Sequence, residues 1–108
     1  MLALNALADP TRQRIVEMLA ARELSAGDIA GKFDVSAPAI SQHLKVLKEA
    51  KLVRVRADAQ RRIYALDPEG FEEMEEWLER IRRFWRGKLD ALERVLKEDD
   101  RKPGRKKS

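Results

Sequence analysis

The stretch "SAPAISQHLKVLKEA", residues 36–50, has the pattern of one amphipathic helix. Ser36 is a favoured N-cap residue, and Pro38 is tolerated in a first turn, where its missing N–H costs no internal hydrogen bond. Apolar residues recur at spacings of four and three, which predicts one buried face: Ile40, Leu44 and Leu47. The stretch also holds His43, the only histidine of the chain, whose role depends on the surrounding sequence.

The residues before this helix predict three further helices. An apolar helix is expected over residues 2–8, and Asp9 followed by Pro10 marks the start of a second one. A short third helix, capped by Ser25, leads through a tight turn at residues 34–35 into the helix over 36–50. A short helix, a tight turn and a longer helix make a helix-turn-helix.

The residues after this helix predict a β-hairpin over residues 53–66. Valine and arginine alternate over 53–56, and β-forming residues return at 63–66. A polar stretch, residues 58–60, lies between them, without the Asn-Gly or Asp-Gly of the commonest hairpin turns. We therefore expect a mainly α fold with a small β-hairpin.

A long final helix is expected over residues 68–97, again opened by an Asp-Pro pair. Its apolar face is too long to be buried by so small a domain, so we expect a symmetric dimer through helices 2–8 and 68–97. Folding of this helix back over its own domain is the alternative. The predicted interface residues are Leu2, Leu4, Leu7, Phe71, Met74, Leu78, Ile81, Trp85 and Leu92.

Composition predicts one domain, residues 1–98, with a basic disordered tail, residues 99–108. The chain of 108 residues contains no cysteine, which excludes disulfides and thiolate metal sites on it. No segment has the apolar length of a signal peptide or membrane span, so we expect a cytoplasmic protein without a membrane partner. Residues 36–66 carry seven basic and two acidic side chains. Such a basic patch is typical of a polyanion partner, and a solvated surface is the alternative.

Two motifs resemble one known family. "LADPTR", residues 7–12, and "ISQHLKVLKEAKLV", residues 40–53, followed by a short hairpin, are similar to the ArsR/SmtB family of winged helix-turn-helix repressors. The resemblance covers residues 3–96. It implies the helix order α-α-α-α-β-β-α, a homodimer joined by the terminal helices, and binding to double-stranded DNA at pseudo-palindromic operators.

The resemblance also implies which residues meet DNA. Residues 36–50 would be the recognition helix in the major groove, with Ser36, Ala37, Pro38, Ser41, Gln42, His43 and Lys45 as contacts. Residues 53–66 would be the wing, with contacts from Arg54, Arg56, Arg61 and Arg62. For His43, a structural position at the helix edge is the alternative to a DNA contact. A role as metal ligand or catalytic base would need partners that its helix neighbours do not supply.

The sequence departs from the family at its metal-sensing positions. The stretch "ELSAGDI", residues 23–29, has Ser25 and Gly27 where metal-sensing members have cysteine, and the last helix has no histidine. We therefore expect no metal and no cofactor, and an unidentified small-molecule effector stays open. Lys51 stands where members often have a glycine in left-handed conformation, and the wing turn lacks the usual glycine.

Two other functions are alternatives to a DNA-binding repressor. One is a winged-helix protein-interaction module without base readout. The absence of acidic residues between positions 36 and 48 favours DNA, because only a nucleic-acid surface needs to avoid carboxylates there. The other is an enzyme, which we do not expect. No nucleophile–base pair, phosphate-binding loop or metal cluster stands at usable spacing.

Overall fold

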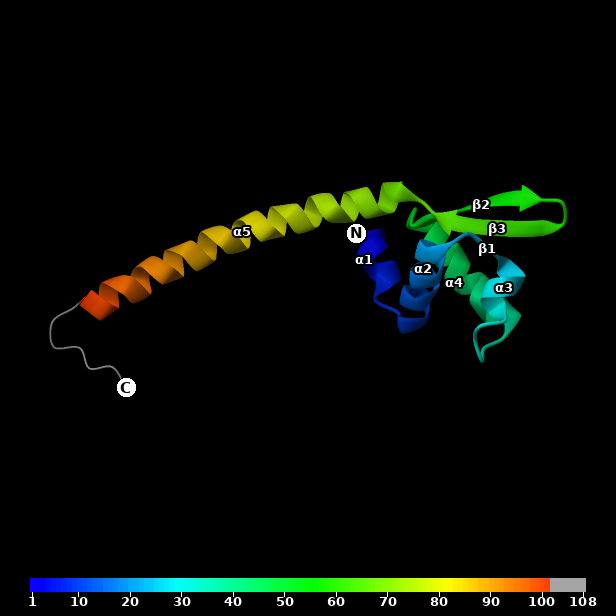
Figure 1. Ribbon diagram of the computed structural model, residues 1–108, viewed down its shortest axis with the longest axis horizontal. Coiled ribbons are helices and arrows are strands. Elements are labelled where there is room, and N and C mark those ends of the chain that lie inside the picture. Colours follow the sequence, from blue (N-terminus) through cyan, green and yellow to red (C-terminus); the bar gives the residue numbers. More distant parts are fainter. Residues whose placement is uncertain (102–108) are drawn as a thin grey trace. The chain divides into compact units, whose positions relative to one another are not determined.

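The computed structural model describes residues 1–101 of the chain. In chain order its elements are α1 (Leu2–Leu7), α2 (Pro10–Ala21), β1 (Leu24–Ser25), α3 (Ala26–Ala30), α4 (Ala37–Glu49), β2 (Val53–Asp58), β3 (Arg61–Leu66) and α5 (Pro68–Arg101) (Figure 1). The mainly helical fold with a β-hairpin is confirmed. Residues 1–74 form one compact unit, and a second unit begins at residue 75, within α5.

Side-chain caps define where three of the helices begin, as the sequence predicted. Asp9 Oδ2 accepts a hydrogen bond of 3.0 Å from the backbone N–H of Arg12 at the start of α2. Ser25 and Asp28 cap α3 reciprocally, each side chain accepting from the other residue's backbone N–H. Ser36 Oγ accepts from the N–H of Ala39 at 3.2 Å. A cap of this kind stabilises a helix by about 1 kcal/mol.

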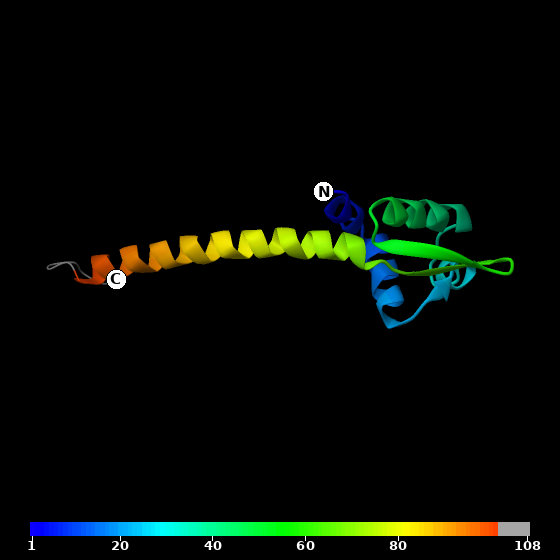
Figure 2. The ribbon, with the colours of Figure 1, turned by 90° about the horizontal axis from the view of Figure 1, so that it is seen from above.

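The core of the first unit lies where α4 meets α2, α3 and the sheet. The apolar face of α4 contributes three side chains that are at most 1% exposed. Figure 2 shows α4 running along one side of the hairpin. The largest fully buried side chains are Ile15, Ile29, Ile40, Leu44, Leu47, Leu52 and Val53. This packing directs the opposite, polar face of α4 to solvent.

The sheet has one strand more than the sequence predicted. Its order is β1-β3-β2, and β1 adds the antiparallel pairs Leu24 with Tyr64 and Ser25 with Ile63. The predicted order α-α-α-α-β-β-α is therefore incomplete, because a short strand stands between the second and third helices. Two residues are too few to show an alternating pattern, so only tertiary pairing reveals this strand.

The end of α4 has a left-handed residue that is not glycine. Lys51 has φ 59°, which confirms the expectation for this position. The N–H of Leu52 bonds the carbonyl of Leu47 at 3.0 Å, and the N–H of Lys51 bonds that of Lys48 at 3.0 Å. These two bonds form a Schellman motif, which ends a helix with a left-handed residue. Both leucines are fully buried, which fixes the direction of the chain into β2.

The wing turn is tight, although it contains no glycine. The hairpin pairs as far as Asp58 with Arg61, which leaves Ala59 and Gln60 as a two-residue turn. Ala59 has φ 56°. A positive φ at the first central residue is the requirement that a glycine usually meets in such turns.

The final helix α5 is longer than expected. It runs to Arg101, so residues 98–101 continue it, although the predicted helix ended at 97 and the predicted tail began at 99. The remainder of that tail lies outside the described residues. Within residues 1–101, no helix combines the length and apolar character needed to cross a membrane.

Candidate nucleic-acid interface

The outer face of α4 gathers the predicted base-reading residues on one open surface. Burial of the apolar face of α4 points them to solvent, and they line one shallow hollow together. All of them are exposed: Ala37, Pro38, Ser41, Gln42 and Lys45. Ser36, also exposed, uses its hydroxyl as the cap of α4. This face offers an amide, a hydroxyl, a methyl group and a cation, which are the groups that read base edges in a major groove.

A cleft of about 490 Å³ lies between α4 and the hairpin. Ser41, Lys45 and Lys48 line it from α4, and Val55, Ala57, Arg62 and Tyr64 line it from β2 and β3. Arg56 also lines it, although its guanidinium bonds Glu23 outside the cleft. Three cations therefore face the cleft, Lys45, Lys48 and Arg62, and no carboxylate of the described part of the chain lines it. Concentrated positive charge beside a base-reading helix suits the phosphate backbone that flanks a groove.

The register of the hairpin separates the four predicted wing arginines. Directly paired residues of two strands point to the same face of a sheet, and neighbours along a strand point to opposite faces. Arg62 pairs with Ala57 and so lies on the face that borders the cleft. Arg61, its neighbour, points to the other face, as do Arg54 and Arg56. The predicted wing contacts are therefore divided between two faces.

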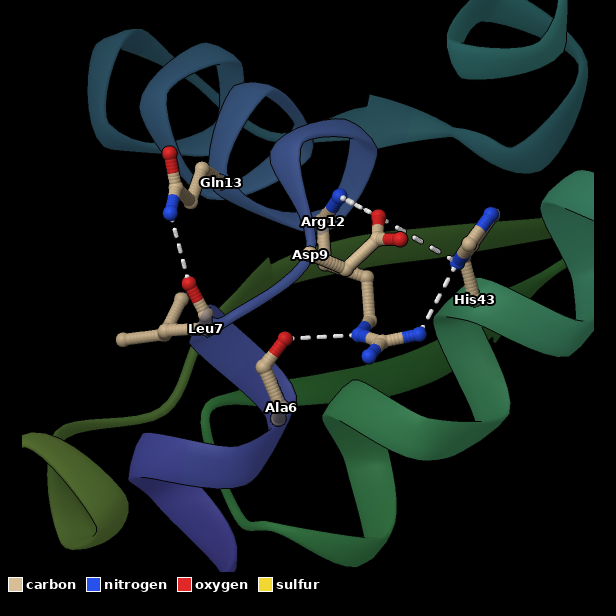
Figure 3. A network of polar contacts seen from close by, with 6 residues as sticks. All are labelled: Ala6, Leu7, Asp9, Arg12, Gln13 and His43. Atoms are coloured by element: carbon tan, nitrogen blue, oxygen red, sulfur yellow. Dashed lines mark hydrogen bonds and ion pairs between the residues drawn. The ribbon is translucent and has the colours of Figure 1, made fainter.

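His43 lies in a polar network between α4 and the start of α2 (Figure 3). Its Nδ1 is 3.2 Å from a guanidinium nitrogen of Arg12 and 3.8 Å from Asp9 Oδ2. The guanidinium can only donate, so Nδ1 is the acceptor in this hydrogen bond. The His43 side chain is 23% exposed. His43 therefore has the structural position at the helix edge that the sequence left as an alternative. A DNA contact from His43 stays a prediction.

Arg12 joins three helices in this network. Its Nε donates to the carbonyl of Ala6 in α1 at 2.6 Å, and its guanidinium reaches His43 in α4. Its backbone N–H bonds the Asp9 carboxylate, and this hydrogen bond, with the positive charge of Arg12, holds the pKa of Asp9 below its ordinary value. The contacts fix the position of α4 relative to α1 and α2.

Sequence reasoning missed two residues of this region. Lys48 follows Lys45 by three positions and Ser41 by seven, so helical spacing already placed it on the cleft side of α4. In the sequence, Arg12 stands out only as part of "LADPTR", and its contact with a residue 31 positions away has no local signal.

Comparison with known proteins gives the family of this chain. A family described as a helix-turn-helix domain matches residues 7–56. The HTH-type transcriptional regulator Rv2034 of Mycobacterium tuberculosis is 46% identical over 94 residues, which cover 87% of this chain and 85% of that protein. The transcriptional repressor SdpR of Bacillus subtilis is 36% identical over 74 residues, covering 68% and 82%. An ArsR-like transcriptional regulator from Rhodococcus sp. RHA1 has a solved structure that matches at TM-score 0.74 and 29% identity, covering 87% of this chain and 89% of that one.

The chain belongs to the ArsR family of transcriptional regulators. The resemblance read from residues 7–12 and 40–53 is confirmed, and so is the winged helix-turn-helix fold. As a member of the ArsR family, the chain is a DNA-binding transcriptional regulator. The exposed face of α4 and the adjoining cationic cleft are the parts of its surface that suit this function.

The residues predicted to join two ArsR-family subunits fall into three groups. Some pack partly against the core of their own unit: Leu7, Phe71 and Met74. Two are half-buried: Leu4 and Ile81. The others are exposed: Leu2, Leu78, Trp85 and Leu92. The second unit exposes four further apolar side chains that the predicted set did not include: Phe84, Leu89, Val95 and Leu96.

Side chains that could bind a metal ion do not cluster in the described part of this ArsR-family chain. Over residues 1–101, no three side chains among histidine, aspartate and glutamate stand close enough together to hold a metal ion. At the positions of the family cysteines, Ser25 caps α3 and Gly27 lies within that helix. Ser25 therefore has a structural role in this chain, as the cap of α3.

Proposed function

We propose that this chain is a homodimeric transcriptional repressor that binds a pseudo-palindromic operator, with α4 in the major groove and the β2–β3 hairpin as wing. The observation that carries the proposal is the outer face of α4, where five exposed polar or small side chains stand together without a carboxylate. Two such faces in a dimer would meet two half-sites about 34 Å apart, one turn of DNA.

Each side chain of this face has a role that its chemistry allows. Gln42 can form a bidentate pair with adenine, Ser41 can bond either kind of base, and Ala37 can contact a thymine methyl group. Lys45 and Lys48, at the cleft, would bind phosphates and add affinity that does not depend on sequence. Specificity would then come mainly from the first half of α4 and affinity from its second half.

The apolar side chains of the second unit support the dimer. Seven of them, between residues 78 and 96, are 42–59% exposed in the single chain. Exposure of so many large apolar groups on one helix is unfavourable in water, and pairing with a second copy would bury them. The long helix and the exposed Leu2 of α1 would together provide the surface that joins the subunits.

The first experiment is selection of binding sites from a random duplex library at near-physiological salt. Recovery of a short inverted repeat, with half-site centres one DNA turn apart, is the expected result. Placed at a promoter, this repeat should lower transcription when the protein is added in vitro. Recovery of no common sequence would refute base-specific readout by α4.

Two variants then separate readout from phosphate binding. Gln42→Ala should relax the preference at one position of each half-site, a loss of about 1–3 kcal/mol in discrimination. Lys48→Gln is the matched control in the same helix. It should weaken binding to all sequences alike and lower the salt slope by about 1. Unchanged base preference in Gln42→Ala would refute the role given to this residue.

The dimer is tested separately by sedimentation. The side chain of Leu92 is 53% exposed, so Leu92→Glu should leave the first unit folded while it weakens association. We expect a shift from dimer to monomer. We also expect the variant to bind the full inverted repeat more weakly than the unaltered protein does. An unchanged dimer mass in Leu92→Glu, and in a second variant at Trp85, would place the interface elsewhere.

A further inference from the structure

Two ion pairs occupy the face of the wing that points away from the cleft. Arg61 donates to Asp28 Oδ2 at 3.3 Å, and Arg56 donates to Glu23 Oε1 at 3.5 Å. Both carboxylates lie on the body of the first unit, Asp28 in α3 and Glu23 just before β1. Arg56 lines hollows on both sides of β2, but its guanidinium is directed to Glu23.

Arg62, next to Arg61 in the sequence, has a different environment. It lies on the cleft face with Lys45 and Lys48, and no carboxylate of the described chain lines that cleft. Successive side chains of a β-strand point to opposite faces of the sheet, so these two adjacent arginines lie on different faces. One faces the cations beside the recognition helix, and the other is paired with an acid on the body.

We propose that Glu23 and Asp28 set the DNA specificity of the wing by holding Arg56 and Arg61 away from DNA phosphates, so that Arg62 alone binds DNA among the three arginines of residues 56–63. The proposal rests on the DNA-binding function proposed above. Each phosphate contact by an arginine adds affinity for every sequence alike, so a wing with fewer available cations binds random DNA less and discriminates better.

The ion pairs are suited to this role because they are local and exposed. The paired side chains are 49–59% exposed, so the pairs hold the arginines by weak attraction rather than by burial. Removal of the negative charge should therefore free the arginines without unfolding the hairpin. Asp28→Asn keeps an oxygen that can accept from the Ser25 N–H, and the cap of α3 is retained.

The test measures the salt dependence of binding to a random-sequence duplex of roughly 30 base pairs, between about 50 and 200 mM salt. Arg62→Gln should lower the slope of log affinity against log salt by about 0.9 for each wing, whereas Arg61→Gln should leave it unchanged. The double variant Glu23→Gln, Asp28→Asn should bind this duplex several-fold more tightly, with a steeper slope. Glu17→Gln, which removes one carboxylate charge on α2, is the control for net charge, and twice its effect is the reference for the double variant, which removes two charges.

A second comparison isolates the arginines as the cause. The gain from Glu23→Gln with Asp28→Asn should disappear when Arg56 and Arg61 are both glutamine, because no cation is then released. Equal slopes for the Arg61 and Arg62 variants would overturn the inference while leaving DNA binding intact. A gain in the double variant no larger than twice that of Glu17→Gln would do the same. No binding of the unaltered protein to any duplex at low salt would instead refute the proposed function.

Discussion

Replacement of Gly70 by alanine should destabilise the first unit strongly, although alanine is the better helix former. Gly70 stands in the first turn of α5, and its N–H donates to the carbonyl of Lys51 at 2.8 Å. A Cβ on Gly70 would lie 2.6 Å from that carbonyl oxygen and 2.7 Å from the oxygen of Ala50. Both are backbone atoms at the end of α4, so the clash cannot be relieved by rotation of a side chain.

The magnitude follows from three effects. Overpacking against fixed backbone costs about 1–3 kcal/mol, and weakening of the Gly70 hydrogen bond adds about 1 kcal/mol. The higher helix propensity of alanine offsets up to about 1 kcal/mol. The net loss is about 2 kcal/mol, which lowers the urea midpoint of unfolding by on the order of 1 M.

Gly87 provides the matched control in the same helix. A Cβ at Gly87 meets no atom within 4 Å, so Gly87→Ala gains helix propensity without a clash. It should be neutral or stabilising by up to about 1 kcal/mol. The assay is urea unfolding followed by circular dichroism at one protein concentration, since association alters apparent stability. A Gly70→Ala midpoint equal to that of Gly87→Ala would refute the close contact between α4 and α5.

Three further predictions concern turns, caps and acid. Ala59→Gly should raise the free energy of unfolding by about 0.5–1 kcal/mol, because glycine adopts a positive φ without strain, and urea unfolding should show it. Ser36→Ala should lower it by about 1 kcal/mol through loss of the α4 cap; no change would contradict the 3.2 Å bond. Hydrogen bonds hold the pKa values of Asp9 and Asp28 below their ordinary value. Their stabilisation is therefore present above about pH 4 and is lost as pH falls through the lower folded-state values. The melting temperature should fall on acidification, and less so in Asp9→Asn.

Local sequence patterns were enough to predict most of the helices and the hairpin. The starts of α2 and α4 could be predicted from their caps and prolines, because capping is an interaction between residues three positions apart. The buried face of α4 was readable because apolar residues at helical spacing have only one direction in which to pack. The left-handed residue at Lys51 was expected from the family resemblance, and the structure has it.

The division of the wing and the environment of His43 were decided by tertiary structure. The arginines of the hairpin are chemically identical, so the sequence does not distinguish them. Strand register places Arg61 and Arg62 on opposite faces of the sheet. Strand β1, two residues long, exists because β3 lies beside it. Arg12 meets His43 only after α2 and α4 have packed.

By itself, the sequence determined the helix-turn-helix, the hairpin and the family, because these depend on residues close along the chain. Tertiary structure alone decided which cations share a surface with the recognition helix and which are paired with acids on the body. The physical reason is that charge acts through space, so the partner of Arg61 is a carboxylate 33 positions earlier in the chain.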